Sequence, residues 1–319
     1  MAAILVACPA FAFDLQGHRG ARGLAPENTL AAFAKALEIG VTTLELDTGI
    51  TRDGIVVVSH NPELNPDITR DADGRFLTAS GPAIHSLTLA ELRRFDIGRL
   101  NPATSYARGF PDQRPADGAR IPTLAEVFDL ARRAGNADVR FNVETKIFPD
   151  RPALTPAPDA FADALVALIR AEGMSRRATI QSFDWRTLRR VQASAPEIET
   201  VYLSAEQRFL DNIERGRPGP SPWTAGFDVD EYAGSVPRLV HAAGGRIWSP
   251  FYVDATPEVL AEAKRLGLRV IVWTVNDPME MDRLIERGVD GIISDRPDIL
   301  RRVMAARGLA LPVPTPLSR

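Results

Sequence analysis

The sequence predicts a closed α/β barrel of the TIM type, and two observations support this prediction. Short runs of β-branched and apolar residues alternate with helical stretches along the whole chain, as in parallel strands joined by crossover helices. There are eight such runs, near residues 13–17, 43–48, 139–144, 178–182, 199–203, 246–249, 269–273 and 290–294. Eight strand-helix units predict a (β/α)8 barrel, and 319 residues suffice for one.

The helix starts between these runs carry readable caps. Thr123 and Glu126 have the spacing of a capping box, and Thr256 and Asp277 each precede a proline at the first helical position. We expect Asp184, after the fourth run, to cap a helix as well. The predicted helices therefore fit between the predicted strands.

One interval interrupts the alternation. Residues 61–120 separate the second and third runs by far more chain than a barrel helix needs. Turn signals and a short helix capped by Thr88 predict a small insertion lobe over one end of the barrel. We expect this lobe to shape substrate selectivity more than chemistry. The barrel would then span residues 13–306, followed by a Pro-rich tail at 307–319.

The start of the chain resembles the end of a secretory signal. Residues 1–12 are nearly all apolar, and residues 10–12 would serve as a small-x-small cleavage site before Asp14. The positively charged beginning is missing, so the signal would be truncated, and we expect a periplasmic or secreted protein. The alternatives are a buried first strand in a cytoplasmic protein, or a lipid anchor through Cys8 in a lipoprotein-like box. This run is too short to span a membrane, and no other segment is long and apolar enough to do so.

Charge and cysteine content exclude several classes of partner and site. The net charge of −3 and the pI of about 5.9, with both signs spread along the chain, argue against a nucleic-acid partner. A single cysteine and no Cys/His cluster exclude an internal disulfide and a structural zinc site. Any metal must therefore bind to oxygen ligands. The oligomeric state stays open.

The strongest local signal, HRGARG at residues 18–23, directly follows the first predicted strand. Catalytic residues of α/β barrels lie at such strand ends. There His18 can transfer a proton while Arg19 holds a phosphoryl oxygen, unless the two only fix a loop. His60 closes another apolar run, and paired with His18 it suggests an opposed general acid and general base. We expect Asn28, in the following PENT segment, to cap a helix.

Carboxylates gather at two of the predicted strand ends. Glu45 and Asp47 alternate with leucines, so both face the inside of a closed barrel, and Glu144 and Lys146 likewise share a face of the third strand. Buried carboxylates repel one another unless a cation neutralises them. Three of them suit one hard ion, Mg²⁺ or Ca²⁺, with Lys146 adding a positive charge. The alternative is a salt-bridge layer that plugs the barrel mouth.

Three other residues have weaker signals. Trp273, at the end of the seventh run, forms either an apolar wall of the pocket or part of the core. His85 and His241 lie in the insertion and on a predicted helix, without a carboxylate or phosphate-binding context. We expect neither histidine to take part in chemistry.

Together the motifs resemble those of the glycerophosphodiester phosphodiesterase family from residue 18 to about residue 298. The matching segments are HRG and PENT, ELD at 45–47 within the second run, SH at 59–60, IPTL at 121–124, VETK at 143–146, WTVN at 273–276 and GIISDRP at 291–297. One departure is Asn61, because many relatives have Asp after the histidine. The loop behind His60 is therefore less defined by the resemblance.

The resemblance implies an enzyme that hydrolyses small glycerophosphodiesters to glycerol 3-phosphate and an alcohol. It implies one divalent cation and these roles: His18 and His60 as acid/base pair, Glu45, Asp47 and Glu144 as metal ligands, and Arg19 and Lys146 as phosphate contacts. The sequence does not assign acid and base between the histidines. Two alternatives are a lyase that stops at a cyclic phosphate and a non-catalytic binding protein, although the latter predicts a missing ligand or histidine.

Overall fold

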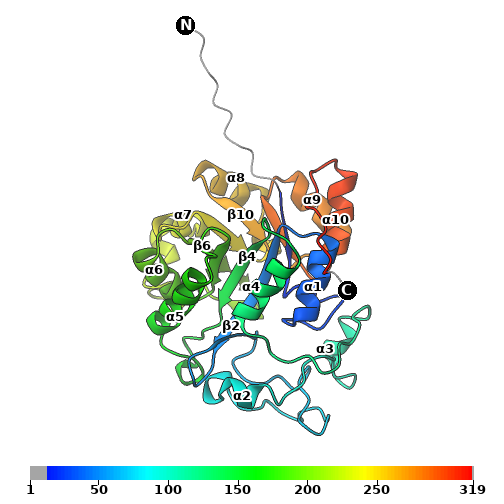
Figure 1. Ribbon diagram of the computed structural model, residues 1–319. Coiled ribbons are helices and arrows are strands. Elements are labelled where there is room, and N and C mark those ends of the chain that lie inside the picture. The colour runs from blue at the N-terminus through cyan, green and yellow to red at the C-terminus, as the bar shows by residue number, and fades with distance from the viewer. Residues whose placement is uncertain (1–12, 318–319) are drawn as a thin grey trace.

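A closed parallel barrel forms the centre of the computed structural model, which describes residues 13–317 (Figure 1). Its eight strands are β1 (Asp14–Gly17), β2 (Thr43–Ile50), β4 (Arg140–Thr145), β5 (Ala178–Ser182), β6 (Glu199–Ser204), β9 (Ile247–Pro250), β10 (Arg269–Val272) and β11 (Gly291–Ser294). They pair in the order β1-β11-β10-β9-β6-β5-β4-β2, and β1 also pairs with β2, which closes the barrel. The predicted TIM-type barrel is confirmed, while the predicted signal at residues 1–12 lies outside the described residues.

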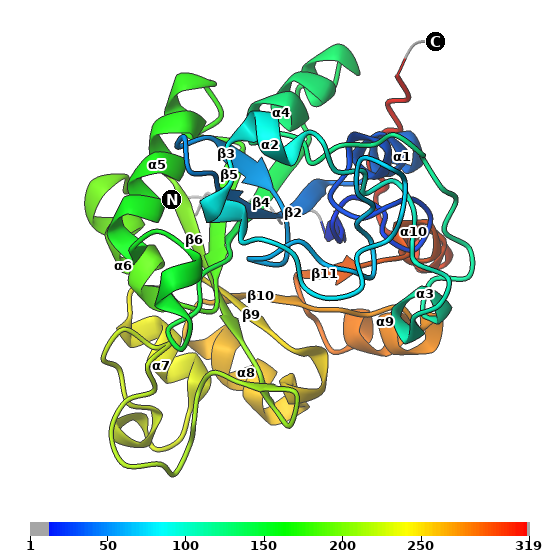
Figure 2. The same ribbon diagram turned by 90° about the horizontal axis from the view of Figure 1, so that it is seen from below.

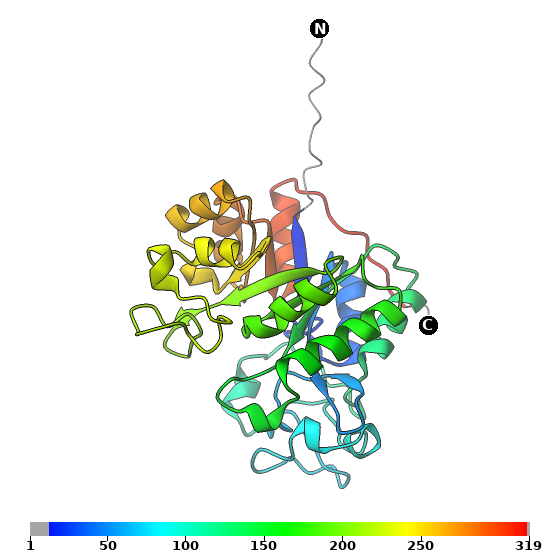
Figure 3. The same cartoon turned by 90° about the vertical axis from the view of Figure 1, so that its left-hand side faces the viewer.

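A helix follows each barrel strand and covers the outside of the sheet (Figures 1 and 3). In chain order these helices are α1 (Leu30–Ile39), α4 (Leu124–Arg133), α5 (Pro158–Ala171), α6 (Trp185–Ser194), α7 (Val236–Ala242), α8 (Pro257–Arg265), α9 (Pro278–Glu286) and α10 (Pro297–Ala306). Leu44 and Leu46 of β2 point outward and belong to one buried cluster with Phe33 of α1 and Phe128 of α4. The main apolar core is therefore the layer between strands and helices.

The helix caps follow the sequence with one correction. Thr123 and Glu126 form both hydrogen bonds of the capping box at α4. The prediction that Asn28 caps a helix is wrong, because the side chain of Thr29 accepts the hydrogen bond at the start of α1. Asn28 instead adopts a left-handed conformation, with φ 54°, and its side chain turns into the barrel mouth.

The inside of the barrel has an apolar half and a polar half. The apolar half comes from β6, β9, β10 and β11, which contribute Val201, Ile247, Ile271 and Ile293. In the polar half, Asn142 donates to Gln16 Oε1 at 3.0 Å and to Gln181 Oε1 at 2.8 Å. Gln181 in turn donates to Glu45 Oε1 at 2.7 Å. This chain of buried amides ends at the carboxylates of the barrel mouth.

Two long connections surround that mouth, at the carboxyl ends of the strands (Figure 2). The first begins with β3 (Val56–Val58), which is antiparallel to β2, and continues through residues 61–120. Those residues contain the 3-10 helix η1 (Ile84–Ser86) and the short helices α2 (Leu89–Leu92) and α3 (Ser105–Arg108). The second joins β6 to α7 and contains β7 (Glu206–Gln207), β8 (Leu210–Asp211) and η3 (Val229–Tyr232). Two further 3-10 helices are η2 (Pro152–Leu154) and η4 (Tyr252–Asp254).

The Pro-rich tail packs on the barrel after α10. The Thr315 backbone N–H donates to Leu37 O at 2.9 Å, and Arg301 donates to Pro312 O at 2.6 Å. Leu309 and Leu317 pack against the main core. None of the helices in the described part of the chain has the length and apolar character needed to cross a membrane.

The capping box of α4 gives a stability prediction. Thr123→Ala should lower the free energy of unfolding by about 1 kcal/mol, because the backbone N–H of Glu126 loses the Thr123 hydroxyl as its acceptor. Thr104→Ala is the matched control, since Thr104 precedes α3 without a side-chain capping bond. Urea unfolding followed by circular dichroism measures both variants. An equal loss in the two would show that the capping bond at α4 contributes nothing of its own.

Candidate active site

Three buried carboxylates meet at the barrel mouth. Glu45 and Asp47 lie on β2, and Glu144 lies opposite Asp47 in the register of β2 with β4. One oxygen from each carboxylate lies within 4.8 Å of the others. All three residues are at most 5% exposed. The alternation that the sequence shows on these strands therefore brings the three predicted metal ligands together.

Both hydrogen bonds to the Glu45 carboxylate come from neutral donors. Its Oε2 accepts the Arg19 backbone N–H at 2.8 Å, and its Oε1 accepts from Gln181. Burial and the charge of Asp47 raise the pKa of Glu45 well above its usual range. Burial also raises the pKa of Glu144 to about 7. Burial thus disfavours the ionised forms of Glu45 and Glu144.

Two cations compensate the cluster in part. Lys146 Nζ lies 2.8 Å from Glu144 Oε1 and 3.3 Å from Asp47 Oδ1, and Arg19 Nε lies 3.2 Å from Asp47 Oδ2. Burial opposes ionisation of Asp47, yet Lys146 holds its pKa well below the usual range. Asn28 also donates to Asp47 Oδ2, at 2.8 Å. Asp47 is therefore the most fully compensated of the three carboxylates.

His18 is oriented by a carboxylate from the other end of the chain. Its Nδ1 lies 2.7 Å from Asp295 Oδ1, and its Nε2 faces the carboxylate cluster, 3.9 Å from Glu45 Oε2. Arg22 and Asn276 bind the same Asp295 carboxylate. Burial opposes ionisation of Asp295, yet Arg22 and then His18 hold its pKa below the usual range. An ionised Asp295 accepts the Nδ1–H and leaves His18 Nε2 free for proton transfer.

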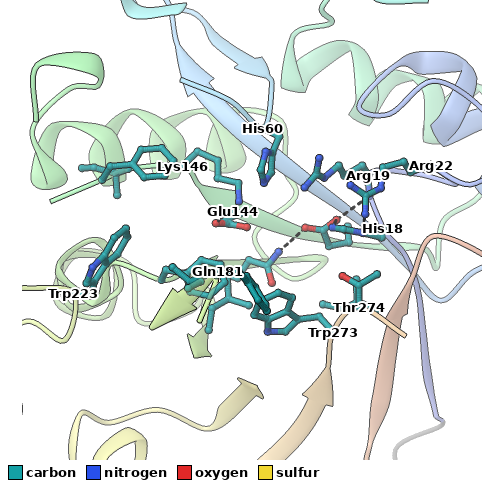
Figure 4. Close-up of a pocket in the computed structure, with 18 of the residues that line it drawn as sticks. His18, Arg19, Arg22, His60, Glu144, Lys146, Gln181, Trp223, Trp273 and Thr274 are labelled. Atoms are coloured by element: carbon teal, nitrogen blue, oxygen red, sulfur yellow. Dashed lines mark hydrogen bonds and ion pairs between the residues drawn. The ribbon is translucent and has the colours of Figure 1, made fainter. Parts of the chain in front are cut away.

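His60 enters the same cavity from the end of the β3 hairpin (Figure 4). Its Nδ1 lies 3.2 Å from Asn61 Oδ1, an acceptor, so the residue that departs from the family pattern still orients the ring. Burial and then the charge of Arg19 lower the pKa of His60 well below its usual range. Burial and then Arg22 lower the pKa of His18 to about 4. Both shifts favour the neutral form of the histidine.

The insertion lobe contacts the loop that carries His18, Arg19 and Arg22. Arg19 donates to Glu27 Oε1 at 2.6 Å, and the Tyr106 hydroxyl, at α3, donates to the other oxygen of Glu27. Arg22 donates to the same hydroxyl at 3.1 Å and lies over the ring of Phe110. Residues 106–113 of the insertion thus fix the conformation of the segment that presents Arg19 and Arg22.

The cavity itself has a volume of about 520 Å³. It is lined by all the predicted site residues except Asp47. A wall of aromatic and aliphatic side chains completes the lining: Phe148, Phe183, Leu203, Phe209, Leu210, Trp223, Trp273 and Ile293. Figure 4 shows Trp273 across the cavity from His60 and Lys146. Among the described residues that line it, none lies between 61 and 120.

The remaining histidines lie elsewhere. His85 lies in η1 with Nδ1 3.0 Å from Ile50 O, and His241 lies near the end of α7. The sequence did not indicate Gln181, Asp295 or Asn276 as site residues. Gln181 and Asp295 lie at the ends of β5 and β11, and Asn276 lies in the loop after β10. The signal that could have found them is their position, since polar residues at strand ends of this face converge on the mouth.

Comparisons with known proteins agree along nearly the whole chain. The profile of the Glycerophosphoryl diester phosphodiesterase family matches residues 18–299. A glycerophosphodiester phosphodiesterase from Caldanaerobacter subterraneus subsp. tengcongensis is 30% identical over 291 residues, which cover 91% of this chain and 97% of that protein.

Solved structures show the same agreement. A Silicibacter pomeroyi DSS-3 protein, assigned to the glycerophosphoryl diester phosphodiesterases, is 37% identical with a TM-score of 0.83, over 95% of this chain and 96% of that one. An Oleispira antarctica phosphodiesterase, solved in complex with the product sn-glycerol-3-phosphate, is 22% identical with a TM-score of 0.65, over 92% and 98% of the two chains. The second likeness concerns the fold alone.

The contact between the insertion and the site gives a test. Tyr106→Phe removes the hydroxyl that binds Glu27 and should loosen Arg19. The kcat/KM for a glycerophosphodiester, the substrate that the family resemblance implies, should fall about tenfold, as is usual for residues that orient active-site groups. Tyr232→Phe, in η3 and away from the cavity lining, is the matched control and should retain its activity. Unchanged kinetics in Tyr106→Phe would reject this positioning role.

Proposed function

Because the chain belongs to the glycerophosphoryl diester phosphodiesterase family, we propose that this phosphoric diester hydrolase uses a divalent cation and two histidines to cleave its substrates. The products would be glycerol 3-phosphate and an alcohol. The observation that carries the proposal is the common cavity, in which His18 and His60 face one buried carboxylate cluster. Each histidine has its Nδ1 bound, so each presents Nε2 to the cavity.

The carboxylate cluster fits a hard divalent cation. Glu45, Asp47 and Glu144 offer only oxygen donors, which Mg²⁺ and Ca²⁺ prefer. Burial raises the pKa of both Glu45 and Glu144, and a cation bound between them would favour their ionised forms. When bound, such a cation supplies Lewis-acid stabilisation of the charge on the phosphoryl oxygens.

The cationic side chains around the cluster would orient the diester. Arg19 and Lys146 border the cavity, and both are fixed by ion pairs rather than free to swing. Arg22 also lines the cavity and is fixed by Asp295. A phosphodiester anion placed among these groups is held by charge-assisted hydrogen bonds with little loss of side-chain freedom.

The two histidines would divide the proton transfers. We assign the general base to His18, because the Asp295 carboxylate stabilises the imidazolium that forms when Nε2 accepts a proton. His60 has only an amide oxygen behind its Nδ1, and it would return a proton from Nε2 to the departing alcohol. Phosphate binding beside His60 favours its protonated form, which a general acid needs.

Metal removal is the first test of this proposal. Treatment with a chelator should abolish hydrolysis of glycerophosphocholine, and Mg²⁺ or Ca²⁺ should restore it. Glu45→Gln should weaken metal binding measured by isothermal titration calorimetry by at least about tenfold, since one charged ligand is lost. Glu38→Gln, at an exposed position on α1, is the control and should bind metal normally. Full turnover in metal-depleted protein would favour the salt-bridge layer over a metal site.

The histidine roles give a second test. His18→Ala and His60→Ala should each lower kcat by about 10² to 10⁴, the usual contribution of a positioned acid or base. A p-nitrophenyl phosphodiester needs little protonation on departure, so it should restore much of the loss in His60→Ala and little in His18→Ala. His241→Ala, outside the cavity, is the control. Rescue of His18→Ala in place of His60→Ala would reverse the assignment, and near-normal turnover in either variant would refute the pair.

A further inference from the structure

Three buried amide side chains form a continuous hydrogen-bonded chain along the inside of the barrel. They are Gln16 of β1, Asn142 of β4 and Gln181 of β5, and none of them is more than 2% exposed. Asn142 Nδ2 donates both to Gln16 Oε1 and to Gln181 Oε1. We call these three side chains the amide relay. It links a carboxylate at the amino ends of the strands to the carboxylate cluster at the mouth.

The lower end of the relay is fixed by Asp14, the first residue of β1. Asp14 Oδ2 accepts from Gln16 Nε2 at 3.0 Å and lies 3.1 Å from a guanidinium nitrogen of Arg140. Asp14 Oδ1 accepts from the Thr43 hydroxyl at 2.7 Å. Because an ionised carboxylate only accepts hydrogen bonds, Gln16 turns its NH2 group toward Asp14 and its carbonyl oxygen toward Asn142.

The upper end of the relay is Gln181, which lines the cavity (Figure 4). Asn142 donates to Gln181 Oε1, so the NH2 group of Gln181 is left for Glu45, and its Nε2 donates to Glu45 Oε1 at 2.7 Å. The backbone N–H of Arg19 donates to the other oxygen of Glu45 at 2.8 Å. Each oxygen of Glu45 thus has one donor, and together the two donors fix the plane of the carboxylate.

Only one orientation of the three amides suits both carboxylates. If all three amides were turned over, carbonyl oxygens would face Asp14 Oδ2 at 3.0 Å and Glu45 Oε1 at 2.7 Å. Each of these contacts would then be a repulsion between two acceptors. The ion pair of Asp14 with Arg140 therefore determines, through the relay, that a donor and not an acceptor reaches Glu45.

Filling the barrel does not by itself require amides. The other half of the interior is filled by Val201, Ile247, Ile271 and Ile293, and buried amides are destabilising unless they are hydrogen-bonded. The amides occur on β1, β4 and β5, the side of the barrel that includes Glu45 on β2. Their place beside the carboxylates points to a role at the cluster.

We propose that the amide relay is a positioning device for Glu45. Gln181 holds this carboxylate in the orientation that binds the cation, and Asn142 holds Gln181. This inference rests on the proposed metal site and concerns residues that act through Glu45 without binding the cation themselves. Side chains that hydrogen-bond to metal ligands typically contribute about 10- to 100-fold to metal affinity.

The metal affinity of variants tests this role by isothermal titration calorimetry with Mg²⁺ and Ca²⁺. Gln181→Met removes the donor to Glu45 and should weaken binding about tenfold or more. Asn142→Leu should weaken it about threefold or more, although Asn142 lies outside the cavity lining, because Gln181 can then turn its amide away. The matched control is Gln192→Met, on α6 and outside the lining, where Nε2 donates to Gly244 O, and it should bind metal normally.

A double-mutant cycle separates the positioning of Glu45 from a general change in the barrel. In the Glu45→Gln background, Gln181→Met should lower the metal affinity by less than about threefold, because the carboxylate through which Gln181 acts is gone. A purely structural effect would instead multiply the two losses. Circular dichroism confirms that the variants are folded, and the cycle decides the proposal even if Asn142→Leu does not fold.

The outcomes separate the positioning role from the metal site itself. Equal metal affinity in wild type, Gln181→Met and Gln192→Met overturns the positioning role and leaves the metal site standing. Multiplicative losses in the cycle overturn action through Glu45. Binding of neither Mg²⁺ nor Ca²⁺ by the wild-type protein overturns the proposed metal site, and the role of the relay with it.

Discussion

The mutual repulsion of three buried carboxylates is the constraint on which the mouth of this barrel depends. Glu45, Asp47 and Glu144 lie within 4.8 Å of one another and are almost completely buried. Such a cluster persists only if donors and cations surround it. The neighbouring backbone meets this demand, because the loop after β1 turns back to place both the N–H and the guanidinium of Arg19 on β2. The unusual φ of Arg19, 50°, belongs to that turn.

The sequence predicted much of this arrangement because period-two alternation fixes which face of a strand a residue occupies. It therefore predicted all eight barrel strands and the convergence of Glu45, Asp47 and Glu144. It could not predict that Asp295 orients His18, because that contact joins residues 277 positions apart and depends on the closure of the barrel. Local rules also cannot decide which of two adjacent residues caps a helix. Asn and Thr both cap helices well, and in the structure Thr29 rather than Asn28 caps α1.

The insertion illustrates a second limit. Its length and turn residues predicted a lobe near the mouth, but no pattern in residues 61–120 indicates which face of the lobe meets the barrel. The structure places Tyr106 against Glu27, and the cavity wall comes instead from the connections after β4, β5, β6 and β10. The expectation that the lobe governs selectivity remains a prediction, and its contacts act on the loop that carries Arg19 and Arg22.

The pairing of His18 with Asp295 has a consequence for the biosynthesis of the enzyme. The two partners leave the ribosome 277 residues apart. Strand β1 likewise needs β11 as its neighbour. A nascent chain can form helices and single strand-helix units, but it cannot orient the His18 ring before β11 has been synthesised and paired. The contact between His18 and Asp295 thus forms only after the barrel closes.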